Sequence, residues 1–307
     1  MMIGINNIGV YIPQKRKSNL EKLEKFGIDE NFLKNKIGVI TRAVKEEYQK
    51  ASDLCVEAFE NLQKKEEIDI DGIGLSIVVT QNPDYRLPHT SAVVHGKLGL
   101  TKNCACFDIS LGCSGYVYGL AVAVSFMEKF GIKKGLLFTS DPYSEIVDEG
   151  DKNTSLLFGD AATVTLLTEN PKWVIRDALF ETDGKQYEAL IVRDGKLFMN
   201  GRAVFNYVLT SVPKQIQTLL EKNNLSKDDI DLFILHPGSK YMLDVLRLRL
   251  KLPPEKVPID FSEYGNTVSS SIPIVLEKFL NEKGIGRILI SGFGVGLSSA
   301  CAILERV

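Results

Sequence analysis

Residues 113–140 read CSGYVYGLAVAVSFMEKFGIKKGLLFTS, and residues 266–290 read NTVSSSIPIVLEKFLNEKGIGRILI. Each stretch opens on small polar residues, continues through an apolar run to a phenylalanine, reaches a Gly-Ile pair and ends in a short aliphatic segment. The phenylalanine follows the first residue by the same interval in both. We interpret the pair as two copies of one strand-turn-helix unit. A pseudo-twofold relation between the copies would bring Cys113 and Asn266 to one central site.

Strand and helix patterns alternate outward from this repeat over most of the chain. We expect strands at residues 75–80, 106–110, 135–140, 161–167, 173–181, 196–198, 232–235, 287–290 and 298–304, and helices at residues 90–98, 115–130, 202–223, 239–250 and 267–283. The strands at 161–167 and 173–181 are expected to be neighbours in an antiparallel section. The alternation predicts an α/β protein. Because no low-complexity linker interrupts it, we expect two packed halves, residues 1–167 and 168–307.

Composition excludes several classes of function. The chain has 307 residues and a formal net charge of −2, without the basic excess of a nucleic-acid or membrane-surface protein. It lacks a membrane-spanning apolar stretch and the pattern of a signal peptide. Five cysteines, an odd number at low density, predict reduced thiols in a cytoplasmic protein. Cys104 and Cys106 have no matching ligand pair, so we expect no metal site.

Cys113 lies between a predicted strand and the start of a predicted helix. Unpaired N–H groups and the positive end of the helix dipole favour a thiolate there, which would make the cysteine a better nucleophile. Gly112 and Gly115 permit a sharp turn and close approach of a substrate. The alternative is a buried structural cysteine, which is how we interpret the other four.

His236 follows an apolar strand, at the carboxyl end where α/β sheets place their ligands. A satisfied buried histidine is the alternative, and we expect His89 and His95 to be helix-capping or partly exposed. Asn266 opens a predicted helix and by itself favours a capping role. The repeat, however, places it beside Cys113, and a cysteine, a histidine and an asparagine together form a nucleophilic constellation.

The segment SGFGVG, residues 291–296, predicts a glycine-rich turn between two strands. Tight turns need glycine in any case, so such a turn is weak evidence by itself. Beside a reactive thiol, its N–H groups would complete an oxyanion hole.

Together these motifs resemble the ketoacyl-ACP synthase III enzymes, condensing enzymes of the thiolase superfamily. The motifs are FDISLGCSG at 107–115, FGDA at 158–161, MNG at 199–201, His236, GNT at 265–267 and FGVG at 293–296. The resemblance covers essentially the whole chain. It implies a five-layered αβαβα fold with two pseudo-twofold-related halves, a homodimer, and decarboxylative Claisen condensation of an acyl thioester with malonyl-ACP. The implied substrates are acyl-CoA or acyl-ACP and malonyl-ACP, with no cofactor.

The resemblance also implies roles for individual residues. Cys113 would accept the acyl group, while His236 and Asn266 would polarise the malonyl thioester for loss of carbon dioxide. The backbone N–H groups of Cys113 and Val295 would form the oxyanion hole. Leu87 would reach across the dimer and close the neighbour's acyl pocket.

Several positions depart from the family pattern. Phe32 stands where a tryptophan usually stacks on the CoA adenine, and Lys36 and Lys152 replace the arginines that flank it. Lysine lacks the planar fork of arginine, so weaker CoA recognition is expected. Ser239 replaces the asparagine of a motif that follows the histidine. We therefore expect a divergent member.

Basic residues after the His236 strand suggest a docking face for an acidic carrier protein. They are Arg247, Arg249 and Lys251. A solvated helix face is the alternative.

The sequence alone leaves two other functions open. One is an acyltransferase that loads Cys113 without decarboxylation. The other is a non-catalytic partner subunit. A degradative thiolase is disfavoured because no cysteine precedes the glycine loop at residues 291–294.

Overall fold

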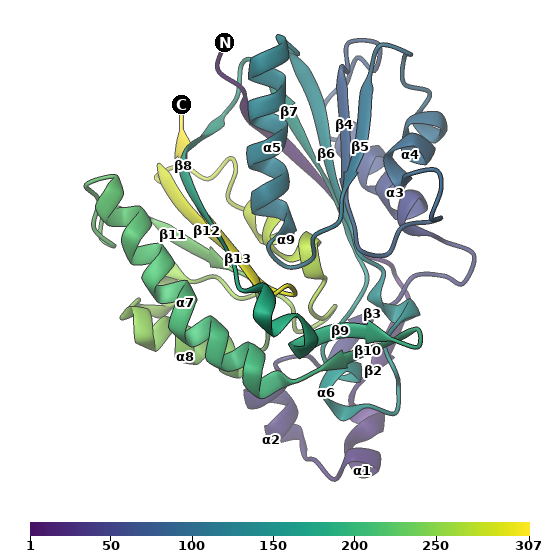
Figure 1. Ribbon diagram of the computed structural model, residues 1–307, viewed down its shortest axis with the longest axis vertical. Helices are drawn as coiled ribbons and strands as arrows, with labels where there is room; N and C mark the ends of the chain where they lie inside the picture. Colours follow the sequence, from purple (N-terminus) through teal and green to yellow (C-terminus); the bar gives the residue numbers. More distant parts are fainter.

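The computed structural model describes residues 1–307 (Figure 1). Its strands are β1 (Gly4–Tyr11), β2 (Arg16–Ser18), β3 (Thr41–Ala43), β4 (Leu75–Val79), β5 (Ala105–Ile109), β6 (Lys134–Ser140), β7 (Ala162–Thr168), β8 (Trp173–Thr182), β9 (Leu190–Arg193), β10 (Lys196–Met199), β11 (Leu232–Leu235), β12 (Arg287–Gly294) and β13 (Ser298–Arg306). Its α-helices are α1 (Leu23–Phe26), α2 (Glu30–Phe32), α3 (Ala51–Gln63), α4 (Thr90–Leu98), α5 (Gly115–Phe130), α6 (Lys152–Ser155), α7 (Gly201–Lys222), α8 (Lys240–Leu250) and α9 (Ser271–Glu277). No helix is long and apolar enough to cross a bilayer.

Nine strands form the central sheet in the order β11-β12-β13-β8-β1-β7-β6-β4-β5. The two ends of this order belong to different halves of the chain. They meet where β1 and β8 pair through Ile5 and Trp173 alone. β4 is parallel to β5 and β6, and β11 is parallel to β12, while β7 and β13 run antiparallel to their neighbours. β4-β6-β7-β1 in the first half corresponds to β11-β12-β13-β8 in the second, which gives the pseudo-twofold relation.

Three hydrophobic cores separate five layers of helix and sheet. The middle core lies between the two parts of the sheet and includes Tyr116 of α5 and Ile272 of α9. A second core joins α3 and α4 to the outer face of the first part, and a third joins α7 and α8 to the outer face of the second. Alternating strand residues serve different cores: Leu137 faces the middle, whereas its neighbours Leu136 and Phe138 face α3. Figure 1 shows α5 and α9 enclosed between the two parts of the sheet. The predicted five-layered αβαβα fold is confirmed.

Some local predictions are wrong. β7 and β8 are not neighbours, because β1 lies between them and pairs antiparallel with each. The helix expected at 267–283 is shorter: a 3-10 turn occupies Val268–Ser270 and α9 ends at Glu277. β10 pairs with β9 in a separate hairpin. Residues 291–294 belong to β12, so the turn before β13 is tighter than expected. The boundary between the halves at residue 167 stays a prediction.

Candidate active site

One pocket contains Cys113, His236 and Asn266. Cys113 follows β5, His236 follows β11, and Asn266 precedes the 3-10 turn at 268–270. Each side chain is therefore supplied by the end of a secondary-structure element. All three are almost completely buried, with exposed fractions of 4%, 1% and 2%. The pocket has a volume of about 210 Å³, and 11 of its 19 lining residues are hydrophobic. The pocket is therefore suited to bind an apolar group beside the Cys113 thiol.

Glycines make room around Cys113. A Cβ on Gly294 would lie 2.7 Å from the Cys113 sulfur, and one on Gly292 would lie 2.4 Å from the Cys113 carbonyl oxygen. Gly294 also has a φ of +157°, which other residues rarely adopt. The conformation at Val295 does not require positive φ, so a valine there can supply a main-chain donor.

The expectation that the helix start would make Cys113 a thiolate is wrong for the free protein. Burial and the charge of Asp141 raise the pKa of the thiol to about 12, although backbone N–H groups of Val295 and Cys113 oppose the shift. Desolvation thus outweighs the helix end, and the resting cysteine is a thiol. An acyl transfer at this sulfur needs a group that takes its proton.

His236 is a neutral imidazole. Burial lowers its pKa to about 3. Its backbone N–H donates to the carbonyl oxygen of Ser291 at 2.9 Å, and its ring meets Phe293 edge to face, with centroids 5.7 Å apart. Nδ1 has no hydrogen-bond partner. The ring is therefore held uncharged by burial, and kept in place by packing and by the main chain.

Asn266 is fixed on both sides. Its backbone N–H donates to the carbonyl oxygen of Leu157 at 2.8 Å, and its carbonyl oxygen accepts from Gly159 at 3.0 Å. Its side-chain Oδ1 accepts the N–H of Val268 at 2.9 Å. Nδ2 consequently faces the pocket, 3.3 Å from His236 Nε2. The amide presents a donor to any carbonyl bound there.

Phe32 and Lys152 line the same pocket, and the ammonium of Lys152 lies 4.9 Å from the centre of the Phe32 ring. Lys36 is outside the lining residues; its ammonium is 3.6 Å from the ring centre of Tyr241. Leu87 does not approach this pocket either, since it lies at the surface with an exposed fraction of 87%. The roles expected for these four residues stay predictions.

The three basic residues after the His236 strand differ in availability. Arg247 donates to the carbonyl oxygen of Leu252 at 3.1 Å, so part of its guanidinium serves the end of α8. Arg249 and Lys251 are exposed. Ser239 caps α8, with its hydroxyl accepting the N–H of Met242 at 3.2 Å.

Sequence reasoning missed several residues that shape the site. Phe293 positions His236, Phe158 forms a bridge with Asn266, and Asp141 affects the thiol. Phe158 and Phe293 lie within the motifs FGDA and FGVG, so the sequence did contain a signal for these two residues. Asp141 follows a strand in the same way as His236 does, but it carried no motif.

Comparisons with known proteins cover nearly all of the chain. The model of 3-oxoacyl-[acyl-carrier-protein (ACP)] synthase III matches residues 107–184, and that of its C-terminal part matches residues 220–306. The beta-ketoacyl-[acyl-carrier-protein] synthase III of Streptococcus sanguinis is 31% identical over 316 residues, 96% of each chain.

Solved structures of similar proteins share the fold of this chain. The 3-oxoacyl-(acyl-carrier protein) synthase of Burkholderia xenovorans is 34% identical with a TM-score of 0.91, covering 100% of this chain and 94% of the other. The beta-ketoacyl-[acyl carrier protein] synthase III of Thermus thermophilus is 29% identical with a TM-score of 0.90, covering 99% of each.

Proposed function

Since the chain belongs to the 3-oxoacyl-[acyl-carrier-protein] synthase III family, whose members are condensing acyltransferases, we propose that Cys113, His236 and Asn266 catalyse its two half-reactions. The observation that carries this assignment is the meeting of the three buried side chains in one mainly apolar pocket. Neither a non-decarboxylating transferase nor a non-catalytic subunit is favoured by these relatives.

In the first half-reaction, the sulfur of Cys113 attacks the carbonyl carbon of an acyl thioester. The Cys113 proton is relayed through the neutral imidazole of His236 to the departing sulfur in step with the attack, so no free imidazolium forms, and the sulfur leaves as CoA-SH or a carrier thiol as the old C–S bond breaks. Main-chain N–H groups of Cys113 and Val295 stabilise the tetrahedral oxyanion. The apolar lining receives the acyl chain.

In the second half-reaction, malonyl-ACP enters and its thioester carbonyl accepts hydrogen bonds from His236 and Asn266. The bond to the malonyl carboxylate breaks, carbon dioxide leaves, and the electron pair forms an enolate that these donors stabilise. The enolate carbon attacks the acyl-Cys113 carbonyl and expels the sulfur, which takes a proton from solvent. The product is a 3-oxoacyl thioester, and no cofactor is required.

Carrier binding is proposed at the basic face of α8. Arg249 and Lys251 are exposed there, and the acidic surface of an acyl carrier protein would complement them, with a smaller contribution from Arg247. Phe32 and Lys152, which line the pocket, and Lys36, which lies outside its lining, would contact the CoA or pantetheine portion.

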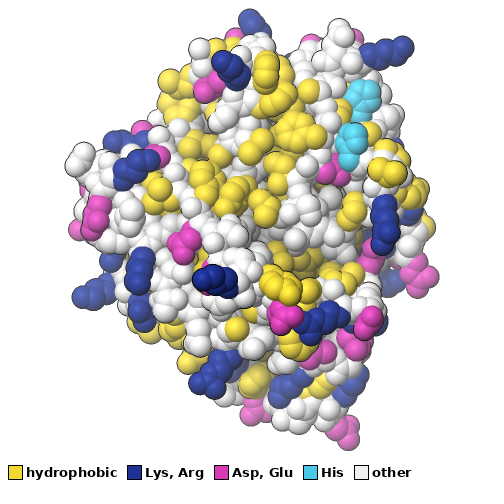
Figure 2. Space-filling view, viewed as in Figure 1, with side chains coloured by type: hydrophobic (Ala, Val, Ile, Leu, Met, Phe, Trp, Pro, Cys, Tyr) yellow, Lys and Arg dark blue, Asp and Glu magenta, His cyan; other side chains and the backbone are white.

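We also propose a homodimer. β5 is an edge strand whose outer side is unpaired, and an exposed apolar surface lies beside it, lined by Tyr118, Val122, Phe126, Phe130 and Phe180 among others. Figure 2 shows hydrophobic side chains gathered over α5 on this face. A dimer across this face would give Leu87 a neighbour's pocket to close. The low cysteine density fits a cytoplasmic location.

The test is stepwise acylation. The protein is incubated with acyl-CoAs and acyl-ACPs of increasing chain length, and intact mass and peptide mapping locate the acyl group. Malonyl-ACP is then added while carbon dioxide and 3-oxoacyl-ACP are measured. We expect acylation of Cys113, none in Cys113→Ser, and chain extension on addition of malonyl-ACP. Acylation without carbon dioxide release would contradict the proposal.

A further inference from the structure

Two segments that are distant in sequence form one part of the pocket rim. Residues 20–32, which include α1 and α2, end at Phe32, and residues 149–156 contain α6 with Lys152. Figure 1 shows α1, α2 and α6 together at one end of the molecule. No side chain of residues 20–32 is buried. Because apolar burial contributes little here, polar contacts must hold this segment in place.

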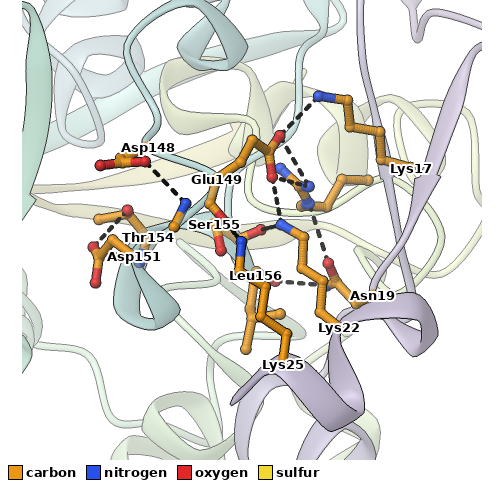
Figure 3. A network of polar contacts seen from close by, with 12 residues as sticks. Lys17, Asn19, Lys22, Lys25, Asp148, Glu149, Asp151, Thr154, Ser155 and Leu156 are labelled. Carbon is orange, nitrogen blue, oxygen red and sulfur yellow. Dashed lines mark hydrogen bonds and ion pairs between the residues drawn. The ribbon is translucent and has the colours of Figure 1, made fainter.

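The carboxylate of Glu149 makes one of those contacts, with Lys22, and two further ion pairs with residues outside the segment. Lys17 Nζ lies 2.8 Å from it, Lys22 forms a second ion pair with it, and Nη2 of Arg42 lies 3.0 Å from it. Figure 3 shows Glu149 between Lys17 and Lys22. Lys25 donates to the Glu149 carbonyl oxygen at 2.9 Å. We call Glu149 with these four cations the clasp.

Other bonds continue the clasp along the same two segments. Lys22 also donates to the carbonyl oxygen of Ser155 at 3.0 Å, and Asn19 donates to that of Leu156 at 2.9 Å. Lys152 donates to the carbonyl oxygen of Phe26 at 3.4 Å. The side-chain bonds therefore join residues 19–26 to 149–156, the two segments that carry or adjoin Phe32 and Lys152.

The burial of Arg42 makes the Glu149 carboxylate hard to replace within the clasp. Arg42 is completely buried, and its Nη1 has no partner, so the carboxylate is its main counter-charge. Burial works against ionisation of Glu149, but hydrogen bonds from Lys17 and Lys22 and the Arg42 charge outweigh it and lower its pKa to about 2. The carboxylate is consequently charged at neutral pH.

We propose that Glu149 is a positioning residue for the thioester donor, holding Phe32 and Lys152 together at the rim of the pocket. This inference rests on the proposed function. Loss of the carboxylate removes the Lys22 ion pair and loosens the segment 20–32, so the pocket rim grips the part of the donor beyond the acyl group less tightly. The chemistry at Cys113 does not change, because none of its partners belongs to the clasp.

The test compares a long donor with a truncated one. Rates of Cys113 acylation are measured against concentration for acetyl-CoA and for acetyl-N-acetylcysteamine, which lacks the nucleotide. In Glu149→Gln we expect the half-saturating concentration of acetyl-CoA to rise about tenfold, the size of one lost charged hydrogen bond, with the maximal rate unchanged. The truncated donor should react as in the wild type.

Two variants control the comparison. Glu149→Asp should restore part of the acetyl-CoA affinity. Glu145→Gln removes a carboxylate of similar exposure, 45% against 42%, that pairs with Lys45 outside the clasp, and should leave both donors unaffected. Unchanged acetyl-CoA dependence in Glu149→Gln, or equal losses with both donors, would overturn the inference.

A second readout is independent of catalysis. Amide hydrogen exchange of residues 20–32 should accelerate in Glu149→Gln and stay at the wild-type rate in Glu145→Gln. If Glu149→Gln does not fold, Lys17→Gln removes an exposed cation that pairs with the carboxylate and should show both effects in smaller degree. A wild type that never acylates Cys113 refutes the proposed function, whereas unchanged exchange refutes the clasp whatever the activity.

Discussion

Nδ2 of Asn266 lies 3.3 Å from Nε2 of His236, although the two residues belong to different elements. The amide cannot turn over freely, since Val268 donates to its oxygen at 2.9 Å and Ser271 lies 3.4 Å from that oxygen. The amide donor is thus fixed before substrate arrives. Fixed donors stabilise a developing enolate without reorganisation at the moment of reaction.

Asn266→Ala should separate the two half-reactions. It removes the amide donor to the malonyl carbonyl and leaves Cys113 in place, so acyl-Cys113 should still form at close to the wild-type rate. Decarboxylation should fall by about 10²- to 10³-fold. Acylation is followed by intact mass, and decarboxylation by release of labelled carbon dioxide. Loss of acylation in a folded variant would show that Asn266 acts earlier than proposed.

The resting state of Cys113 predicts how its alkylation depends on pH. A pKa near 12 leaves little thiolate at pH 7, so the rate with iodoacetamide should rise about tenfold per pH unit from pH 7 to 9.5 without a plateau. The Asp141 charge contributes to the raised pKa, so Asp141→Asn should react faster at each pH. Peptide mapping assigns the modified cysteine, with Cys113→Ser as control. A plateau near pH 7 would mean that the thiolate already prevails.

The three residues that meet in the pocket were predictable because each is marked locally. Cys113 and His236 follow apolar strands, and Asn266 opens a turn, so short motifs identify them without knowledge of the fold. The protonation state of Cys113 was not predictable in this way. It depends on burial and on Asp141, and neither is visible in the residues next to the cysteine.

Strand β1 shows why part of the topology was missed. Its alternation is broken by Asn6 and Asn7, where the pairing with β7 shifts register, so the segment does not resemble a regular strand. Without β1, the strands on either side of it were expected to pair with each other. The clasp could not be predicted from the sequence either, since Glu149 and Lys17 are 132 residues apart.

Gly294→Ala tests the space beside the nucleophile. The added Cβ would lie 2.7 Å from the Cys113 sulfur in a backbone conformation with φ of +157°, so acylation should fall by at least about 10²-fold. Gly96→Ala is the matched control, because a Cβ there meets nothing within 4 Å and the residue lies within α4. It should keep full acylation and gain up to about 1 kcal/mol of stability. Stopped-flow acylation and urea unfolding measure the two effects, and normal acylation by Gly294→Ala would be incompatible with the site as built.

His236 should make stability depend on pH in a predictable direction. Its folded pKa is about 3, below the unfolded value of about 6.5, so between these values the unfolded chain binds more protons and stability falls as pH falls. Burial favours the neutral ring. The contribution of His236 to the free energy of unfolding therefore drops by about 2 kcal/mol from pH 7 to pH 5. His236→Gln lacks this titration. The difference in unfolding free energy between wild type and variant, measured in urea at both pH values, should therefore shift by that amount in favour of the variant at pH 5, while the titration of Asp141 cancels in the comparison. A difference that is the same at both pH values would mean that the imidazole titrates normally in the folded protein.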